Sequence, residues 1–86
     1  MNSNQKIYST AALDKIKKSQ KLRDIYKLLN DGEEPSIEQL QTLRNRLNVN
    51  RSIPSIEFVG ECVNAIPALH DLTLREFFDL KDLKNK

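Results

Sequence analysis

Two helix starts are encoded in this sequence as capping boxes, and they constrain its fold more than any other local feature. Ser36 is followed three residues later by Gln39, and Thr73 is followed in the same way by Glu76. At this spacing the hydroxyl accepts a hydrogen bond from the later backbone amide, and the later side chain accepts one from the amide of the capping residue. We therefore expect one helix to begin after Ser36 and another after Thr73.

Residues that favour sharp turns are scarce. The chain has 86 residues, among them two glycines and three prolines. A fold of many short strands needs more turn residues, and the apolar residues do not alternate over any long window. A chain of this length forms a single core. The expected fold is therefore all-α: a compact single-domain bundle of four short helices, or five if the first is broken.

The first helix is expected to begin after Ser9 or Thr10, because either hydroxyl can cap its first turn. Apolar residues then repeat at spacings of three and four up to about Leu29, except over the polar stretch 17–21. The helix either continues through this stretch or breaks near Ser19.

A further helix is expected in the stretch that Pro54 and Pro67 bound, with Pro54 in its first turn. Gly60 lies inside it and costs about 1 kcal/mol relative to alanine, so another helix is expected to approach closely there. The residues expected to face the core are Ile37, Leu40, Leu43 and Leu47 on the helix after Ser36, and Ile56, Val59, Val63 and Ile66 on this one.

The last helix is expected to extend from Thr73 to Leu83, with Leu74, Phe77 and Phe78 on one face. The expected organisation is a flexible segment at 1–8, a helical domain at 9–83 and a frayed tail at 84–86.

Residue types that carry chemistry are few. The one cysteine, Cys62, lies beside an apolar stripe and is expected to be buried, and the one histidine is His70. Glycines at positions 32 and 60 alone do not build a phosphate-binding loop. We expect a non-enzymatic protein without metal or cofactor. With no internal disulfide and no apolar run of roughly 20 residues, it is expected in the cytoplasm and not in a membrane.

Charge is unevenly distributed along the chain. Residues 1–30 carry a net charge of +5 and residues 31–86 a net charge of −3. This pattern favours a regulator that binds another protein, in the manner of an inhibitor, antitoxin, immunity protein or adaptor. The alternative is a nucleic-acid-binding regulator that uses the basic face of the first helix. A homodimer and a merely solvated lysine face also stay open.

The candidate partner-binding residues are basic, acidic and aromatic: Lys15, Lys17, Lys18, Lys21, Arg44, Arg46 and Arg51, then Glu57 and Glu61, and finally Phe58. Phe58 falls off the apolar stripe of its helix, so it is either an exposed anchor or a core residue of a helix buried on more than one side. A DNA-recognition helix is not expected at 52–66, because this stretch has two glutamates and no lysine or arginine.

Overall fold

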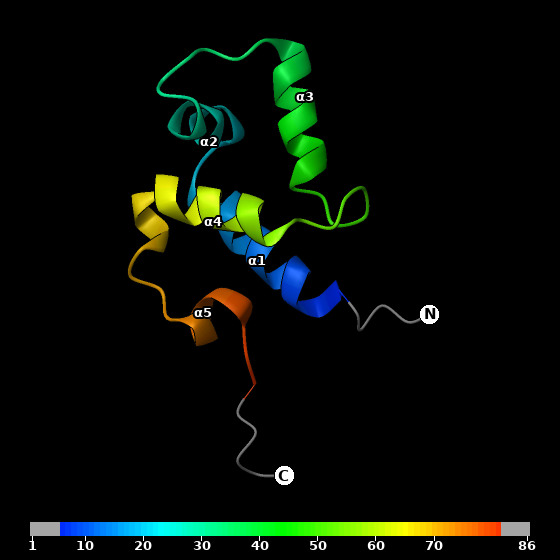
Figure 1. Cartoon of the computed structure of the whole chain (residues 1–86), viewed down its shortest axis with the longest axis vertical. Helices are drawn as coiled ribbons and strands as arrows, with labels where there is room; N and C mark the ends of the chain where they lie inside the picture. The colour runs from blue at the N-terminus through cyan, green and yellow to red at the C-terminus, as the bar shows by residue number, and fades with distance from the viewer. Residues whose placement is uncertain (1–5, 82–86) are drawn as a thin grey trace.

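The structure is a computed structural model that describes residues 6–81 of the chain. Within this range the chain forms five α-helices and one short 3-10 helix, and it contains no strand (Figure 1). The elements are α1 (Ile7–Ser19), α2 (Leu22–Leu29), α3 (Ile37–Arg46), α4 (Ile56–Ala65), η2 (Pro67–Leu69) and α5 (Leu74–Phe78). The all-α prediction is confirmed, in its five-helix form.

The first predicted helix is broken near Ser19. α1 ends at this residue and α2 begins at Leu22, because Gln20 and Lys21 adopt extended backbone conformations. Ser19 Oγ donates a hydrogen bond of 2.6 Å to the carbonyl of Ile16, so a side chain satisfies a carbonyl at the helix end. The break lets α2 leave the direction of α1 and pack against α3 and α4.

The predicted start of the first helix was wrong. α1 begins at Ile7, and its N-cap residue, Lys6, makes no side-chain capping bond. Ser9 and Thr10 lie inside the helix. α1 packs against α5, and tertiary packing of this kind outweighs a local capping preference.

Both capping boxes are present. Ser36 Oγ accepts from the amide of Gln39 at 3.0 Å, and Gln39 Oε1 accepts from the amide of Ser36 at 2.9 Å. The corresponding distances for Thr73 and Glu76 are 3.1 and 2.9 Å. α4 also has a hydroxyl cap, Ser55, so Pro54 precedes the cap and does not lie in the first turn as predicted.

The buried face of α4 differs from the predicted stripe. Cys62 and Ile66 are buried as predicted, and Phe58, which lies outside the predicted stripe, is buried as well, whereas Ile56 is 79% exposed. Val59 and Val63 are partly buried against the core. Because α4 packs against α1 and also against α2, burial extends over more than one of its sides. The whole buried core consists of Ala12, Leu13, Ile16, Ile25, Leu43, Leu47, Phe58, Cys62, Ile66, Leu69 and Phe77.

Two other packing predictions were wrong. Ile37 is 85% exposed, because it is the first residue of a helix that reaches the core only with later turns. A Cβ atom built on Gly60 would meet no atom within 4 Å, so no other helix among residues 6–81 approaches closely there.

The last helix is shorter than predicted. α5 ends at Phe78, and Asp79 takes the left-handed conformation with φ 54°. Leu80 follows the helix and is exposed. Leu83, the predicted last residue of this helix, lies outside the described residues.

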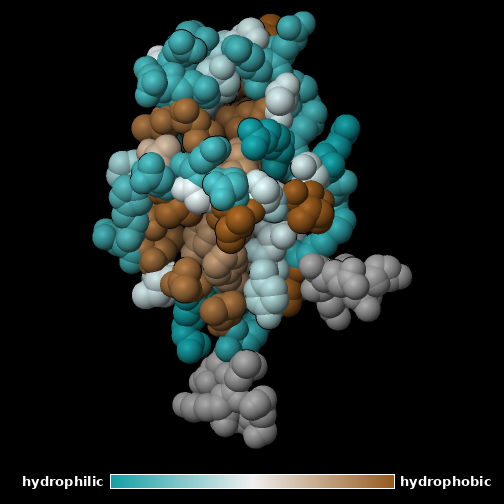
Figure 2. Space-filling model, viewed as in Figure 1, coloured by the Kyte–Doolittle hydropathy of each residue, from teal (hydrophilic) through white to brown (hydrophobic). Residues whose placement is uncertain are grey.

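α4 occupies the middle of the molecule, with α2 and α3 on one side and α1, η2 and α5 on the other (Figure 1). Hydrophobic side chains gather over the lower half of the face shown in Figure 2, whereas hydrophilic ones cover the α2–α3 end. None of the helices in the described part has the length and apolarity that a membrane crossing requires.

Candidate functional site

An open groove of about 610 Å³ lies where α2, α3 and α4 meet. Its apolar lining includes Tyr26 and Leu29 from α2, Leu43 from α3 and Phe58 from α4. Its polar lining includes Glu38, Thr42 and Arg46 from α3 and Glu61 from α4. We call this the α2–α4 groove.

The groove has a buried base and exposed polar edges. Leu43 and Phe58 belong to the core, so their side chains are held by packing from behind. Tyr26 and Leu29 are half-buried and pack against the same core. The polar residues of α3 and α4 are exposed. An apolar base with polar edges is the usual composition of a binding surface.

The turn between α2 and α3 begins at Asn30, which also lines the groove. Asn30 Nδ2 donates to the carbonyl of Tyr26 at 2.9 Å, and this bond ends α2. Gly32 then adopts φ +86°, which a glycine takes without steric cost. The chain can therefore turn sharply, and α3 returns beside α2.

Two predicted site residues contact each other at this groove. The guanidinium carbon of Arg46 lies 3.9 Å from the centroid of the Phe58 ring, within cation–π range. Phe58 is 2% exposed, so the structure makes it a core residue and not an exposed anchor. Arg46 covers the accessible part of its ring.

Cys62 lies one turn after Phe58 and is buried as predicted. Burial raises the pKa of the Cys62 thiol to about 11, although the positive charge of Arg46 opposes the shift and Glu61 adds to it. At neutral pH the thiol is therefore uncharged and a poor nucleophile.

The two glutamates of α4 have different positions. Glu61 lines the α2–α4 groove, whereas Glu57 does not. Glu57 is exposed in the first turn of α4, where a negative charge interacts favourably with the helix dipole. Of these two glutamates, therefore, Glu61 belongs to the groove and Glu57 does not.

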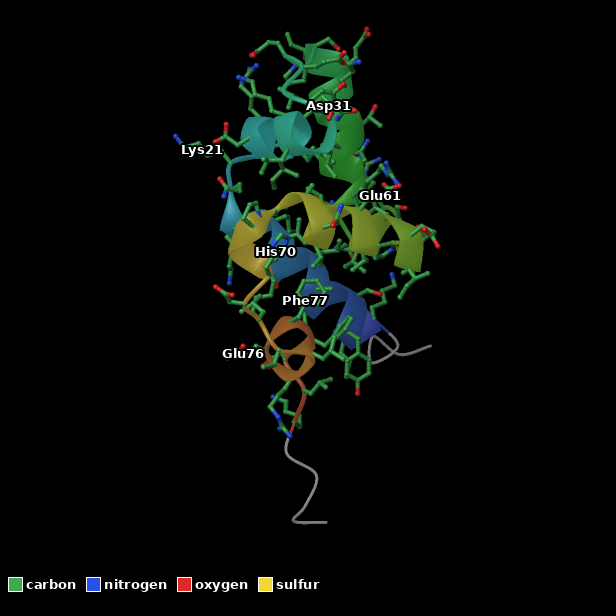
Figure 3. The ribbon with its side chains drawn as sticks, turned by 60° about the vertical axis from the view of Figure 1, so that its left-hand side comes forward. Lys21, Asp31, Glu61, His70, Glu76 and Phe77 are labelled. Atoms are coloured by element: carbon green, nitrogen blue, oxygen red, sulfur yellow. The ribbon has the colours of Figure 1, made fainter. Side chains whose placement is uncertain are left out.

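The predicted basic residues do not form one cluster with Arg46. Lys17 of α1 and Arg44 of α3 flank a second hollow, of about 190 Å³, whose other lining residues are Leu22, Ile25 and Leu47. Lys18 and Lys21 are exposed, and Lys15 is half-buried on α1. Figure 3 shows Lys21 and Glu61 at opposite edges of the molecule. Arg51 lies in the loop between α3 and α4.

An ion-pair cluster that was not predicted reduces the basic character of α2. Lys27 Nζ lies 2.9 Å from Oε1 of Glu34, and Arg23 donates to the other oxygen of the same carboxylate. The hydrogen bonds from Lys27 and Arg23 lower the pKa of Glu34. Pro35, between Glu34 and the capped helix α3, is buried and helps to fix this segment.

Potential metal ligands do not gather within residues 6–81, where no group of three or more His, Cys, Asp or Glu side chains is placed to hold an ion. His70 Nε2 lies 3.1 Å from the carbonyl oxygen of Asn64. Because a carbonyl only accepts, this nitrogen carries the proton in that bond.

Several groove residues were not predicted as a site. Leu29 and Leu43 have the spacing of core residues, and Gln39 and Thr42 have the positions of an ordinary solvated helix face. No local signal in the sequence distinguishes them, because the groove depends on how three helices are placed relative to one another.

The chain matches no protein-family model, and no curated protein or solved structure is significantly similar to it. The shape and charge of its own surfaces are therefore the basis on which a function can be proposed.

Proposed function

We propose that this protein is a small non-enzymatic regulator that acts by binding another protein. The α2–α4 groove is the docking surface, and its occupant is an amphipathic helix of the partner. Inhibitors, antitoxins, immunity proteins and adaptors act in this way, by occupying a surface of their target. A cytoplasmic location belongs to the proposal, because the one cysteine of the chain has no internal disulfide partner.

The shape of the groove is the main observation that supports this proposal. An amphipathic helix binds by inserting its apolar face between the helices of a receptor, with anchors at successive turns. A helix is about 10 Å across, so a groove of about 610 Å³ takes the side chains of one face and leaves the helix backbone outside. Tyr26, Leu28 and Leu29 supply the accessible apolar surface for such anchors, above the buried side chains of Leu43 and Phe58.

The charge at the edges indicates which helix would fit. Glu38 of α3 and Glu61 of α4 both line the groove and are exposed, and the guanidinium of Arg46 lies over the Phe58 ring. A partner helix with basic residues beside its apolar anchors would therefore be complementary. Such complementarity increases the rate of association and disfavours acidic partners.

Site-specific photocrosslinking tests the proposal. A photoreactive residue at Leu28, on the exposed edge of the groove, is expected to capture one discrete protein in an extract of the native host, whereas the same residue at Ile56, outside the groove, is not. Thr42→Arg, which places a bulky charge in the groove, should abolish this product. Thr10→Arg is the matched control on α1.

Equal capture from Leu28 and Ile56, unaffected by Thr42→Arg, would exclude the groove as the docking surface. A product of twice the chain's mass would assign the groove to a second copy and contradict a heterologous partner.

Nucleic-acid binding is the second candidate, because the structure brings basic residues of separate helices together. Lys17 and Arg44 flank one hollow, and Lys18 and Lys21 are exposed nearby in sequence. Affinity for random duplex DNA should then fall steeply with salt, and changing Lys17, Lys18 and Lys21 to glutamate should abolish it. No binding at low salt would remove this candidate.

A further inference from the structure

The break between α1 and α2 creates a surface that differs from the α2–α4 groove in both lining and charge. Because α2 leaves the direction of α1, Lys17 and Arg44 come to flank the hollow of about 190 Å³. The remaining lining is aliphatic, namely Leu22, Ile25 and Leu47. None of these five residues lines the α2–α4 groove.

We infer that this hollow binds the C-terminal residue of another polypeptide when that residue is aliphatic. Lys17 and Arg44 bind the terminal carboxylate, and Leu22 contacts the aliphatic side chain. The inference does not depend on the groove or on the helix proposed to occupy it.

The two cations fit a carboxylate. Arginine presents paired donors that match the two oxygens of a carboxylate, and lysine adds a compact positive charge. Arg44 is exposed, and its guanidinium donates to Gln41 Oε1 at 3.2 Å, which holds the side chain near the helix surface. Lys17 pairs with Asp14 at 3.7 Å, with both side chains about half exposed. Such an exposed ion pair is weak, and an incoming carboxylate can replace it.

The aliphatic lining and the size of the hollow further restrict the kinds of ligand that it can bind. Leu22 is only partly buried and supplies the accessible aliphatic surface of the hollow, above Ile25 and Leu47, which are almost completely buried. Sites for whole cofactors or drug-sized molecules usually enclose roughly 300 to 1,000 Å³, and this hollow is smaller. It suits one side chain. A phosphate group or a nucleic-acid backbone would leave the aliphatic base without a partner.

A polypeptide end is favoured over a free short-chain acid because of what each can contact. A free acid makes only the contacts inside the hollow. A peptide can also place its preceding residues on the exposed surface of the helices that border the hollow. These extra contacts supply affinity that a hollow of this size does not supply alone.

Binding of short peptides tests the inference in the full-length protein. The probes are an N-acetylated pentapeptide of glycines ending in leucine, the same peptide with a C-terminal amide, and isovalerate. The free-acid peptide is expected to shift the backbone amide resonances of residues 17, 22, 25, 44 and 47 in a saturable way. The amide is expected to bind at least tenfold more weakly, because it lacks the charge.

Variants locate the binding site. Lys17→Gln and Arg44→Gln are each expected to weaken peptide binding about tenfold, whereas Arg51→Gln, the same change in an exposed loop, leaves it unchanged. Asp14→Asn should strengthen binding, because it removes the competing carboxylate beside Lys17. Thr42→Arg should abolish capture of a partner at the α2–α4 groove without affecting the peptide, so the two sites can fail separately.

Equal affinity for the acid and the amide would overturn the inference, as would no saturable shift or one at other residues. Isovalerate binding as tightly as the peptide would assign the hollow to a free acid and overturn the polypeptide source. Unchanged binding in both Lys17→Gln and Arg44→Gln would also contradict it.

Discussion

Arg46 places its guanidinium carbon 3.9 Å from the centre of the Phe58 ring, joining the end of α3 to the first turns of α4. Both residues have features of a partner-binding surface in the sequence, since one is charged and the other is an aromatic outside the expected stripe. In the folded protein these two side chains contact each other. Their contact also fixes one wall of the α2–α4 groove.

We expect this contact to contribute measurably to stability. A cation–π pair at a partly exposed site contributes about 0.5 to 1 kcal/mol. In a double-mutant cycle of Arg46→Gln and Phe58→Leu, followed by urea unfolding, the coupling energy should lie in that range. Arg51→Gln serves as the control for loss of a positive charge. Strictly additive effects of the two substitutions would show that the contact contributes nothing.

The two glycines should respond in opposite ways to alanine. A Cβ atom at Gly60 meets nothing within 4 Å, and the residue lies inside α4, so Gly60→Ala should stabilise the protein by about 0.5 to 1 kcal/mol. Gly32 has φ +86°, so Gly32→Ala should destabilise it through backbone strain. Urea unfolding of the two variants checks both signs. Destabilisation by Gly60→Ala would mean that α4 has a closer neighbour than the structure shows.

The Glu34 ion pairs should make stability depend on pH. Lys27 and Arg23 lower the pKa of this carboxyl in the folded state, so its contribution is present above the ordinary carboxyl pKa and is lost as pH falls through the lowered value. Glu34→Gln should therefore lower the thermal midpoint at about pH 7 and have little effect at about pH 2. Glu33→Gln, a change at the adjacent exposed carboxylate, is the control. Salt at about 1 M should reduce the effect. An equal loss at both pH values would point to packing and not to charge.

Cys62 should be unreactive while the protein is folded. With a thiol pKa of about 11, roughly one molecule in a thousand carries a thiolate at about pH 8, and the side chain has no exposed surface. Labelling by an aromatic disulfide reagent should be at least about a hundredfold slower in buffer than in denaturant. Rapid labelling of the native protein would contradict the burial of the thiol.

The raised pKa of Cys62 should also make the stability of the protein depend on pH in the alkaline range. The folded thiol has a higher pKa than the unfolded one, so its contribution to stability is present below about pH 8.5 and is lost as pH rises towards 11. Relative to Cys62→Ala, the natural protein should therefore lose stability over this range. A constant difference would show that thiol ionisation is not linked to unfolding.

Local features of the fold could be predicted from sequence, whereas features set by packing could not. The boxes at Ser36 and Thr73 depend on residues three positions apart, and both are present. The start of α1 and the buried face of α4 depend on neighbours distant in sequence. A single stripe on α4 predicts burial of Ile56, but this helix packs on two sides and buries Phe58 instead.

The candidate site shows the same limit. Charge and residue type identified Lys17, Arg44, Arg46 and Glu61 one by one as candidate site residues. They did not show that Lys17 and Arg44 line one hollow, whereas Arg46 and Glu61 line the α2–α4 groove. The groove's apolar residues have the spacing of ordinary core residues. A surface formed by three helices requires knowledge of their relative positions, which no local pattern contains.

The central position of α4 has a consequence for how such a protein can change during evolution. α4 packs against α1 on one side and against α2, across the groove, on the other. A mutation that alters the groove through the buried residues of α4 would therefore also disturb the packing of α1. The exposed residues Glu38, Gln39 and Thr42 line the groove from α3 and are not part of the buried core. New partner specificity is thus most readily acquired on α3, while α4 is held nearly constant by the fold.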